Sequence, residues 1–318
     1  MYRTPHPPTA VVVSPATVPP FCRPLTERQA QGVARLRVLP VTLAWVAVAV
    51  VVQAEARELA VVTAFTIAIA ATAVGYGWRW VSARRFVAAF ERARASGLRG
   101  QREETMQLLA RLAARCIRTP HQHAAVAVEY AMRISWWGER VQALAILDAV
   151  DASGWLELDM PSVLSSKRSP IESMRSWRVA LLATRARCEI LSGDHREGER
   201  SLARAEALVG AGVPPTILLF SRTLLDGIRG RYEQVVCAVE AVGEARDPLA
   251  NALRAIRAFA LERLGSAEAD SALLEVCSPV FQAPASEPAG LPTVWPEFVA
   301  FLIQHGLLTH TPAEAQDR

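Results

Sequence analysis

Two long runs without a charged residue stand close together near the start of the chain, and they constrain its fold more than any other feature. The first run covers residues 38–54 and the second covers residues 59–78, with only Glu55-Ala56-Arg57-Glu58 between them. As helices they would be about 25 and 30 Å long, against a hydrocarbon core of about 30 Å. Both are apolar on every helical face, which lipid favours and a surface helix does not. We therefore predict a transmembrane helical hairpin over residues 37–80.

Arginines flank this predicted hairpin on both sides, while the turn between the runs holds one Arg and two Glu. The positive-inside rule then places the turn outside and both chain ends in the cytoplasm. The preference for Arg over Lys is typical of GC-rich codon usage, so we predict a bacterial inner-membrane location. The predicted membrane interface consists of Arg35, Arg37, Trp78, Arg79, Trp80, Arg84 and Arg85.

A second interpretation of the two runs stays open. They could form a buried Ala/Val-rich hairpin inside a soluble helical domain, because the first run is short and contains Pro40. In front of them, residues 1–36 are rich in proline and poor in large apolar side chains. Such a stretch cannot fill a core, so we predict a disordered tail there.

Helical periodicity dominates from Phe86 onward and strand signals are scarce, so we predict an all-α fold. A pattern repeats around five glycines that suit tight turns between paired helices. A small residue stands seven positions before each glycine and lets two helices approach closely, and an aliphatic residue stands nine positions after it. The turn glycines are Gly100, Gly138, Gly193, Gly230 and Gly265, spaced 38, 55, 37 and 35 residues apart. The packing residues are Ala93, Ala131, Ala186, Thr223 and Ala258 in the first helices and Leu109, Leu147, Leu202, Val239 and Leu274 in the second.

This pattern resembles the tetratricopeptide (TPR) family, in which helix pairs of about 34 residues stack into a superhelix. The closest match is Ala186-Arg-Cys-Glu-Ile-Leu-Ser-Gly-Asp, which has the small residue of the family and its Gly-Asp turn. Gly230-Arg-Tyr-Glu matches the turn and the aromatic residue after it. The second helices depart from the family, because its aromatic position is aliphatic in this chain. The resemblance implies a TPR-like α-α solenoid over residues 86–277, with a concave face that binds a partner.

Two further segments complete the predicted domain organisation. Residues 151–169 form an insertion in the widest glycine spacing, and Trp155, Leu156, Met160, Val163 and Leu164 lie among its turn formers. This insertion either contacts a partner or folds back on the solenoid. Residues 278–318 are predicted to form a Pro-containing linker, a terminal helix and a tail.

The sequence offers no recognisable constellation for chemistry. His121 and His123 are the only close histidine pair, but residues two apart on a helix point away from each other and would not share a metal. The five cysteines lie far apart without a C-x-x-C pair, which fits neither a disulfide framework nor a zinc site. Phosphate loops, dinucleotide fingerprints and nucleophile elbows do not occur. We therefore predict no catalytic, metal-binding or cofactor-binding residue and no nucleic-acid partner.

These observations lead to one functional hypothesis and one alternative. The chain is predicted to be a membrane-anchored cytoplasmic scaffold or adaptor that binds a protein or peptide, with membrane lipids as further partners. In the alternative, it is a structural subunit of a larger membrane complex that is assembled through the hairpin. Small residues in the second run, such as Gly75 and Gly77, would allow the close approach of other helices. The sequence does not identify the partner or the oligomeric state.

Overall fold

A computed structural model describes residues 18–24, 41–50, 52–53, 58–99, 101–116, 120–156, 174–210, 213–240, 248–276 and 291–308. Every regular element in these ranges is a helix and none is a β-strand, which confirms the predicted all-α class. The elements that precede the third glycine turn are η2 (Pro20–Cys22), α2 (Glu58–Leu98), α3 (Arg102–Arg115), α4 (Pro120–Trp136), α5 (Arg140–Ala152) and α6 (Met174–Leu191). They are followed by α7 (His195–Val209), α8 (Thr216–Ile228), α9 (Tyr232–Glu240), α10 (Pro248–Arg263), α11 (Ala269–Leu274), α12 (Leu291–Val294) and α13 (Pro296–Gln304).

The helices from α4 onward pack as neighbouring pairs, α4 with α5, α6 with α7, α8 with α9 and α10 with α11. A glycine with positive φ stands in the turn of each pair, and in the α6–α7 turn Gly193 has φ of 86°. A residue with a Cβ is strained there, which explains the glycine. The next residue, Asp194, caps α7, because its carboxylate accepts a hydrogen bond from the backbone N–H of Glu197 at 3.2 Å.

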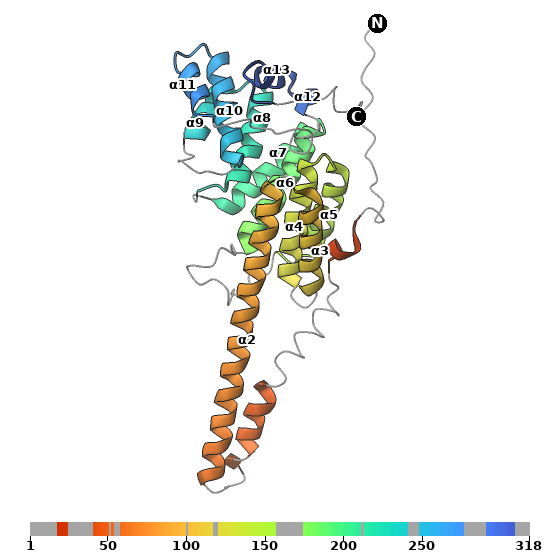
Figure 1. The fold of residues 1–318 in the computed structure, drawn as a ribbon, viewed down its shortest axis with the longest axis vertical. Helices are drawn as coiled ribbons and strands as arrows, with labels where there is room; N and C mark the ends of the chain where they lie inside the picture. Colours follow the sequence, from red (N-terminus) through yellow and green to blue (C-terminus); the bar gives the residue numbers. More distant parts are fainter. Residues whose placement is uncertain are drawn as a thin grey trace.

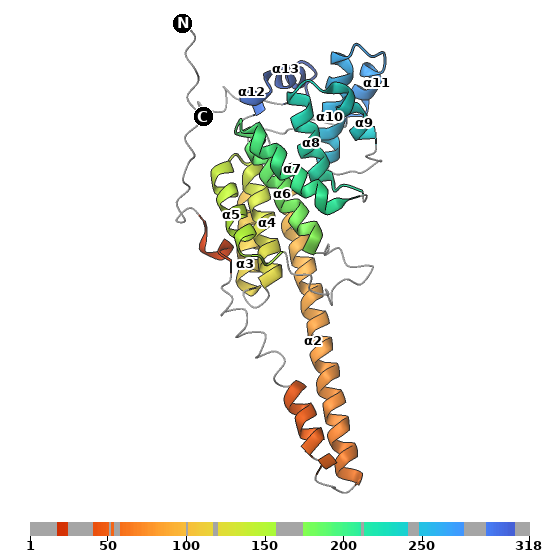
Figure 2. The same cartoon turned by 180° about the vertical axis from the view of Figure 1, so that it is seen from behind.

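If α2 and α3 are counted as the first pair, the first helix of a pair also contacts the first helix of the next pair but one. Phe90 of α2 meets Trp177 of α6 edge to face, with ring centroids 5.4 Å apart. Trp136 of α4 lies against Phe220 of α8 with the two rings tilted by 43° and their centroids 5.5 Å apart. Large rings therefore fill the inner side of the stack at these points, and consecutive pairs wind tightly around a shared apolar core (Figures 1 and 2).

The second uncharged run does not form a helix of its own. It is the first half of α2, which continues through Arg79, Arg84 and Arg85 as one 41-residue helix and packs its second half on α3. The first run is helical over residues 41–50 and 52–53. None of the helices in the described ranges combines the length and the apolar character that crossing a membrane requires. This finding contradicts the predicted transmembrane hairpin and the predicted inner-membrane location with cytoplasmic termini.

Part of the Pro-rich N-terminal stretch packs on the body. η2 contacts α3 and α4, and Cys22 is fully buried there. Phe21 meets the ring of Tyr130 edge to face at 4.9 Å. The backbone of Phe21 also forms a hydrogen bond with His123, and burial lowers the pKa of that imidazole. His123 therefore helps to hold η2 against α4.

The C-terminal helices fold back over the first helices of the preceding pairs. α12 contacts α6 and α13 contacts α10. Trp295, between them, lies so close to Gly227 of α8 that a Cβ on this glycine would stand 2.2 Å from the indole ring. Trp295 and Phe298 stack at 4.5 Å, and both rings meet Phe259 of α10 at 5.4 Å. An aromatic cluster thus closes the C-terminal end of the body.

Candidate functional site

A two-helix hairpin projects from the helical body and is the most exposed apolar part of the described chain. It consists of the helical residues 41–50 and 52–53 and of residues 58–78, the first half of α2. The two segments run side by side in opposite directions (Figures 1 and 2). Hereafter "the hairpin" means these residues. The large apolar side chains that it exposes are Leu43, Trp45, Val46, Val50, Val52, Val62, Phe65, Ile67, Ile69 and Val74, with exposed fractions between 41% and 72%.

Apolar packing, one ring contact and one hydrogen bond hold the two helices of the hairpin together. Val48 and Ala68 are buried between them, and the ring of Trp45 meets Phe65 edge to face at 6.0 Å. The Trp45 indole N–H donates a hydrogen bond to Thr72 Oγ1 at 3.3 Å, and that hydroxyl donates onward to the Ala68 carbonyl at 2.7 Å. Each helix therefore buries only the side that faces the other, and its remaining apolar sides are exposed.

Such a surface is unusual for a folded chain on its own. The ten side chains, spread over the sides of the hairpin, together expose on the order of 900 Å², and apolar patches of about 300–600 Å² on a monomer are already often functional. A helix that is apolar on all sides is normally buried. The hairpin thus has the character of an interaction surface.

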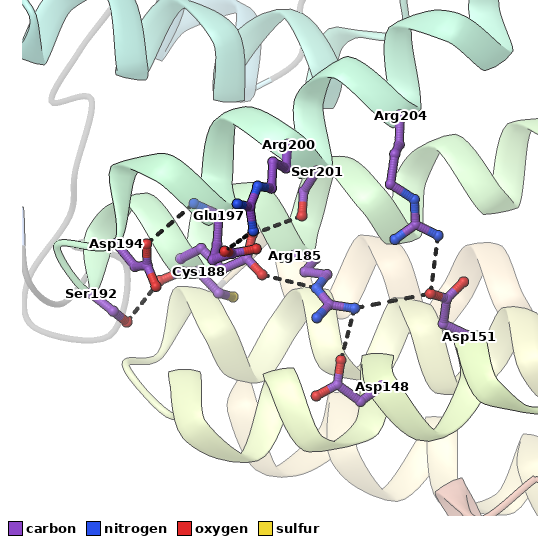
Figure 3. A network of polar contacts seen from close by, with 11 residues as sticks. Asp148, Asp151, Arg185, Cys188, Ser192, Asp194, Glu197, Arg200, Ser201 and Arg204 are labelled. Atoms are coloured by element: carbon purple, nitrogen blue, oxygen red, sulfur yellow. Dashed lines mark hydrogen bonds and ion pairs between the residues drawn. The ribbon is translucent and has the colours of Figure 1, made fainter. Parts of the chain in front are cut away.

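A polar network in the body connects the α4–α5 pair to the α6–α7 pair (Figure 3). Arg185 of α6 donates to Asp148 of α5 at 2.9 Å and to Glu189, one turn further along α6, at 2.9 Å. Ser201 of α7 donates to the other oxygen of Glu189 at 2.8 Å. Arg204 of α7 reaches Asp151 of α5 at 3.3 Å. Side chains from α5, α6 and α7 thus form one connected set.

Burial and charge act against each other in this network. Burial favours the neutral form of Arg185, but the hydrogen bond to Glu189 and the neighbouring carboxylates raise its pKa above the ordinary value. Burial likewise raises the pKa of Glu189, against the hydrogen bonds from Arg185 and Ser201. Each polar side chain finds its partners inside the network, which suits a structural brace more than a ligand site.

Arg187 and Cys188 are adjacent in the sequence, and both side chains are buried in the body. Cys188 is fully buried, and burial raises the pKa of its thiol, which removes thiolate character. Arg187 is 1% exposed and its guanidinium lies 3.9 Å from the ring centroid of Trp136. Among the described residues, no group of three His, Cys, Asp or Glu is placed to hold a metal ion.

The structure places the predicted repeat residues as follows. Gly138, Gly193, Gly230 and Gly265 have positive φ in turns between helices, and Gly100 lies outside the described residues. The small residues of the first helices, with exposed fractions of 1% or less, are Ala93, Ala131, Ala186, Thr223 and Ala258. The second-helix residues Leu109, Leu147, Leu202 and Val239 are buried, whereas Leu274 is 88% exposed. In the insertion, Trp155 and Leu156 pack against the core, and residues 157–173 lie outside the described part.

Of the residues predicted to lie at a membrane interface, the side chains of Arg84 and Arg85 are in the described part of the structure. Arg35 and Arg37 fall outside the described residues, as do the side chains of Trp78, Arg79 and Trp80. Arg84 and Arg85 are exposed on α2, at the base of the hairpin. Sequence reasoning missed the docking of η2 and the aromatic cluster around Trp295, although the concentration of Trp295, Phe298 and Phe301 was a readable signal.

Comparisons with protein-family models, with curated proteins and with solved structures found no match. This result contradicts the resemblance to the TPR family as an assignment. The helix pairs themselves are compatible with a helical repeat that the comparisons assign to no family.

Proposed function

We propose that this chain is a non-catalytic helical scaffold, a solenoid of helix pairs that binds a protein or peptide partner. The observation that carries the proposal is the exposed apolar surface of the hairpin, which projects from the helical body. Stacked helix pairs supply a long framework without chemistry of their own. Because Trp136, Phe220, Phe90 and Trp177 occupy the inner side of the stack, the hairpin offers the larger surface to a partner.

Site-specific photo-crosslinking in cells that express the full chain tests this proposal. A crosslinking residue at Val62 or Ile69 is expected to give a discrete adduct, because both side chains are more than half exposed on the hairpin. The matched control position is Val213, which is 91% exposed on the body and should give none. Equal labelling from all three positions, or no adduct from the hairpin, would contradict a partner surface there.

A second candidate function has its own support. Large apolar side chains are exposed on both flanks of the hairpin, since Trp45, Phe65 and Ile69 lie on one side and Ile67 and Val74 on the other by helical spacing. Several neighbours could then surround it, as in a structural subunit of a larger assembly. A stable complex that purifies with the chain in fixed stoichiometry supports this candidate, whereas a partner that is captured by crosslinking but dissociates during purification without it supports the adaptor.

A further inference from the structure

We propose that residues 18–24 form a detachable strap over a groove on α3 and α4, and that the open groove binds a Pro-rich peptide with one aromatic residue from a partner. The strap consists of η2 and the residues that flank it, and Figure 1 draws it in red beside α3. The groove lies on the body and not on the hairpin. The inference therefore goes beyond the proposed function and can fail without affecting it.

The strap presents an apolar side to the body. Val18 and Cys22 are 7% and 0% exposed, and Phe21 packs partly buried against the core. The ring of Phe21 meets Tyr130 of α4 edge to face at 4.9 Å, and its backbone forms a hydrogen bond with His123. His123 and Tyr130 are seven residues apart, which places them on the same side of α4. The body thus contacts the strap through three side chains and one backbone group.

The backbone of the strap resembles a Pro-rich recognition segment. Pro19 has φ of −54° and ψ of 141°, and Arg23 has φ of −67° and ψ of 126°, on either side of the single turn of η2. These angles are close to those of a polyproline II helix, which aromatic-lined grooves bind because it loses little entropy on binding. Pro20 and Arg23 are exposed, so their side chains do not select the peptide. The groove selects an apolar residue, an aromatic residue and a small residue at the positions of residues 18, 21 and 22.

The strap is a short cover on a helix that is buried along most of its length. Every residue of α4 from 123 to 135 is buried. The elements that contact α4 include α3, α5 and α6, which have 13–18 residues, and η2, which has three. Opening of the strap would expose the side of α4 that carries His123 and Tyr130, and apolar surface in water favours a new cover. A second segment with the same chemistry would supply that cover.

The strap should open more easily than the C-terminal segment, which also folds back on the body. α12, α13 and the residue between them insert five large apolar side chains that are at most 4% exposed, namely Leu291, Trp295, Phe298, Phe301 and Leu302. The strap inserts two buried side chains and one partly buried ring. The cost of local opening grows with the apolar area that it exposes. The strap therefore opens while the body and the C-terminal segment stay folded.

Thiol labelling of the folded wild-type chain tests this opening, because Cys22 belongs to the strap and Cys188 to the core. Mass spectrometry follows both cysteines in one sample at pH 8. Cys22 should be labelled at least 100-fold faster than Cys188, which corresponds to an opening about 2.8 kcal/mol below global unfolding. In low urea the Cys22 rate should stay nearly constant, whereas the Cys188 rate should rise with the slope of global unfolding. Phe21→Ala should raise the Cys22 rate about tenfold, and the matched strap variant Arg23→Ala should leave it unchanged.

A peptide added to the full chain tests the groove. The probe is a fluorescein-labelled peptide of sequence Val-Pro-Pro-Phe-Ala-Arg-Pro, which follows residues 18–24 with alanine in place of the cysteine. The wild-type chain should bind it weakly, because its own strap competes at a high effective concentration. The variant Phe21→Ala/Cys22→Ser should bind it about tenfold more tightly in fluorescence polarisation. A control peptide with alanine in place of phenylalanine should bind that variant about tenfold more weakly.

Two results would overturn the inference. If Cys22 and Cys188 are labelled at equal rates with equal dependence on urea, the strap is a fixed part of the core. This measurement uses the wild-type chain and does not depend on the folding of any variant. If Phe21→Ala/Cys22→Ser binds the probe no better than the wild type, or binds the control peptide equally well, the surface under the strap is not a peptide groove.

Discussion

Replacing Arg187 by methionine should stabilise the protein, although it removes a side chain from the centre of the body. Arg187 is 1% exposed, and no carboxylate is paired with it among the described residues. Its Nη2 donates to Ser135 and, at 3.3 Å, to the Met132 carbonyl, while Nε and Nη1 have no hydrogen-bond partner. The protein therefore keeps a charge in its core with incomplete compensation.

The size of the effect follows from the pKa of Arg187 and from the contacts that are lost. Burial, together with the repulsion of Arg133, lowers the pKa of Arg187 to about 10, against 12.5 in an exposed arginine. Because a lowered pKa means that folding disfavours the cation, the charged form costs about 3 kcal/mol at neutral pH. The stacking on Trp136 returns up to about 2 kcal/mol. Methionine keeps much of the packing, so the net gain should be about 1 kcal/mol.

Urea denaturation followed by circular dichroism measures this change as a shift of the midpoint at constant slope. The matched control is Arg200→Met, which removes an exposed ion pair with Glu197 and should change stability by less than about 0.5 kcal/mol. Since the cost of the Arg187 charge disappears only as the pH rises above about 10, the advantage of methionine should be constant between pH 6 and 9. A loss of more than about 2 kcal/mol in Arg187→Met would refute the reasoning, because the charge would then be compensated.

Three other predictions concern single positions. Trp295→Ala should lower the unfolding free energy by about 3–5 kcal/mol in thermal or urea melts, because the indole is 4% exposed inside the aromatic cluster. Gly193→Ala should lower the unfolding free energy by about 1–2 kcal/mol through its φ of 86° alone, since the added Cβ would meet no other atom. The control Gly77→Ala lies in a helix and has the same free space, so it should raise the unfolding free energy by up to about 1 kcal/mol. In a timed thiol-labelling assay at pH 8, exposed Cys237 should react at once and Cys188 only after unfolding, and early labelling of Cys188 would contradict its burial.

The sequence predicted those parts of the fold that depend on neighbouring residues. Helical spacing of apolar side chains identified the all-α class, and glycines followed by capping residues identified turns such as Gly193-Asp194. These signals are local, because a residue with positive φ or an unsatisfied N–H at a helix start is set by a few adjacent positions. The helices and turns of the body could therefore be predicted from local sequence patterns.

Contacts between distant segments escaped sequence reasoning. Nothing local indicates that Phe21 meets Tyr130, or that Trp295 closes over Gly227. The apolar runs illustrate a different limit, because hydropathy shows that a surface avoids water without showing what covers it. The prediction of a membrane was wrong for the described helices, since the second run belongs to a longer helix that continues into charged residues.

The continuity of α2 links the candidate site to the body. A 41-residue helix is about 60 Å long, and no break separates the half that belongs to the hairpin from the half that packs on α3. Phe90 and Arg94 on this second half contact Trp177 of α6 and Glu129 of α4, so α2 is fixed to two further pairs. A partner that binds the hairpin therefore fixes the orientation of the whole body. The same continuous helix would fix the distance between that partner and the body, which is the property that a scaffold requires.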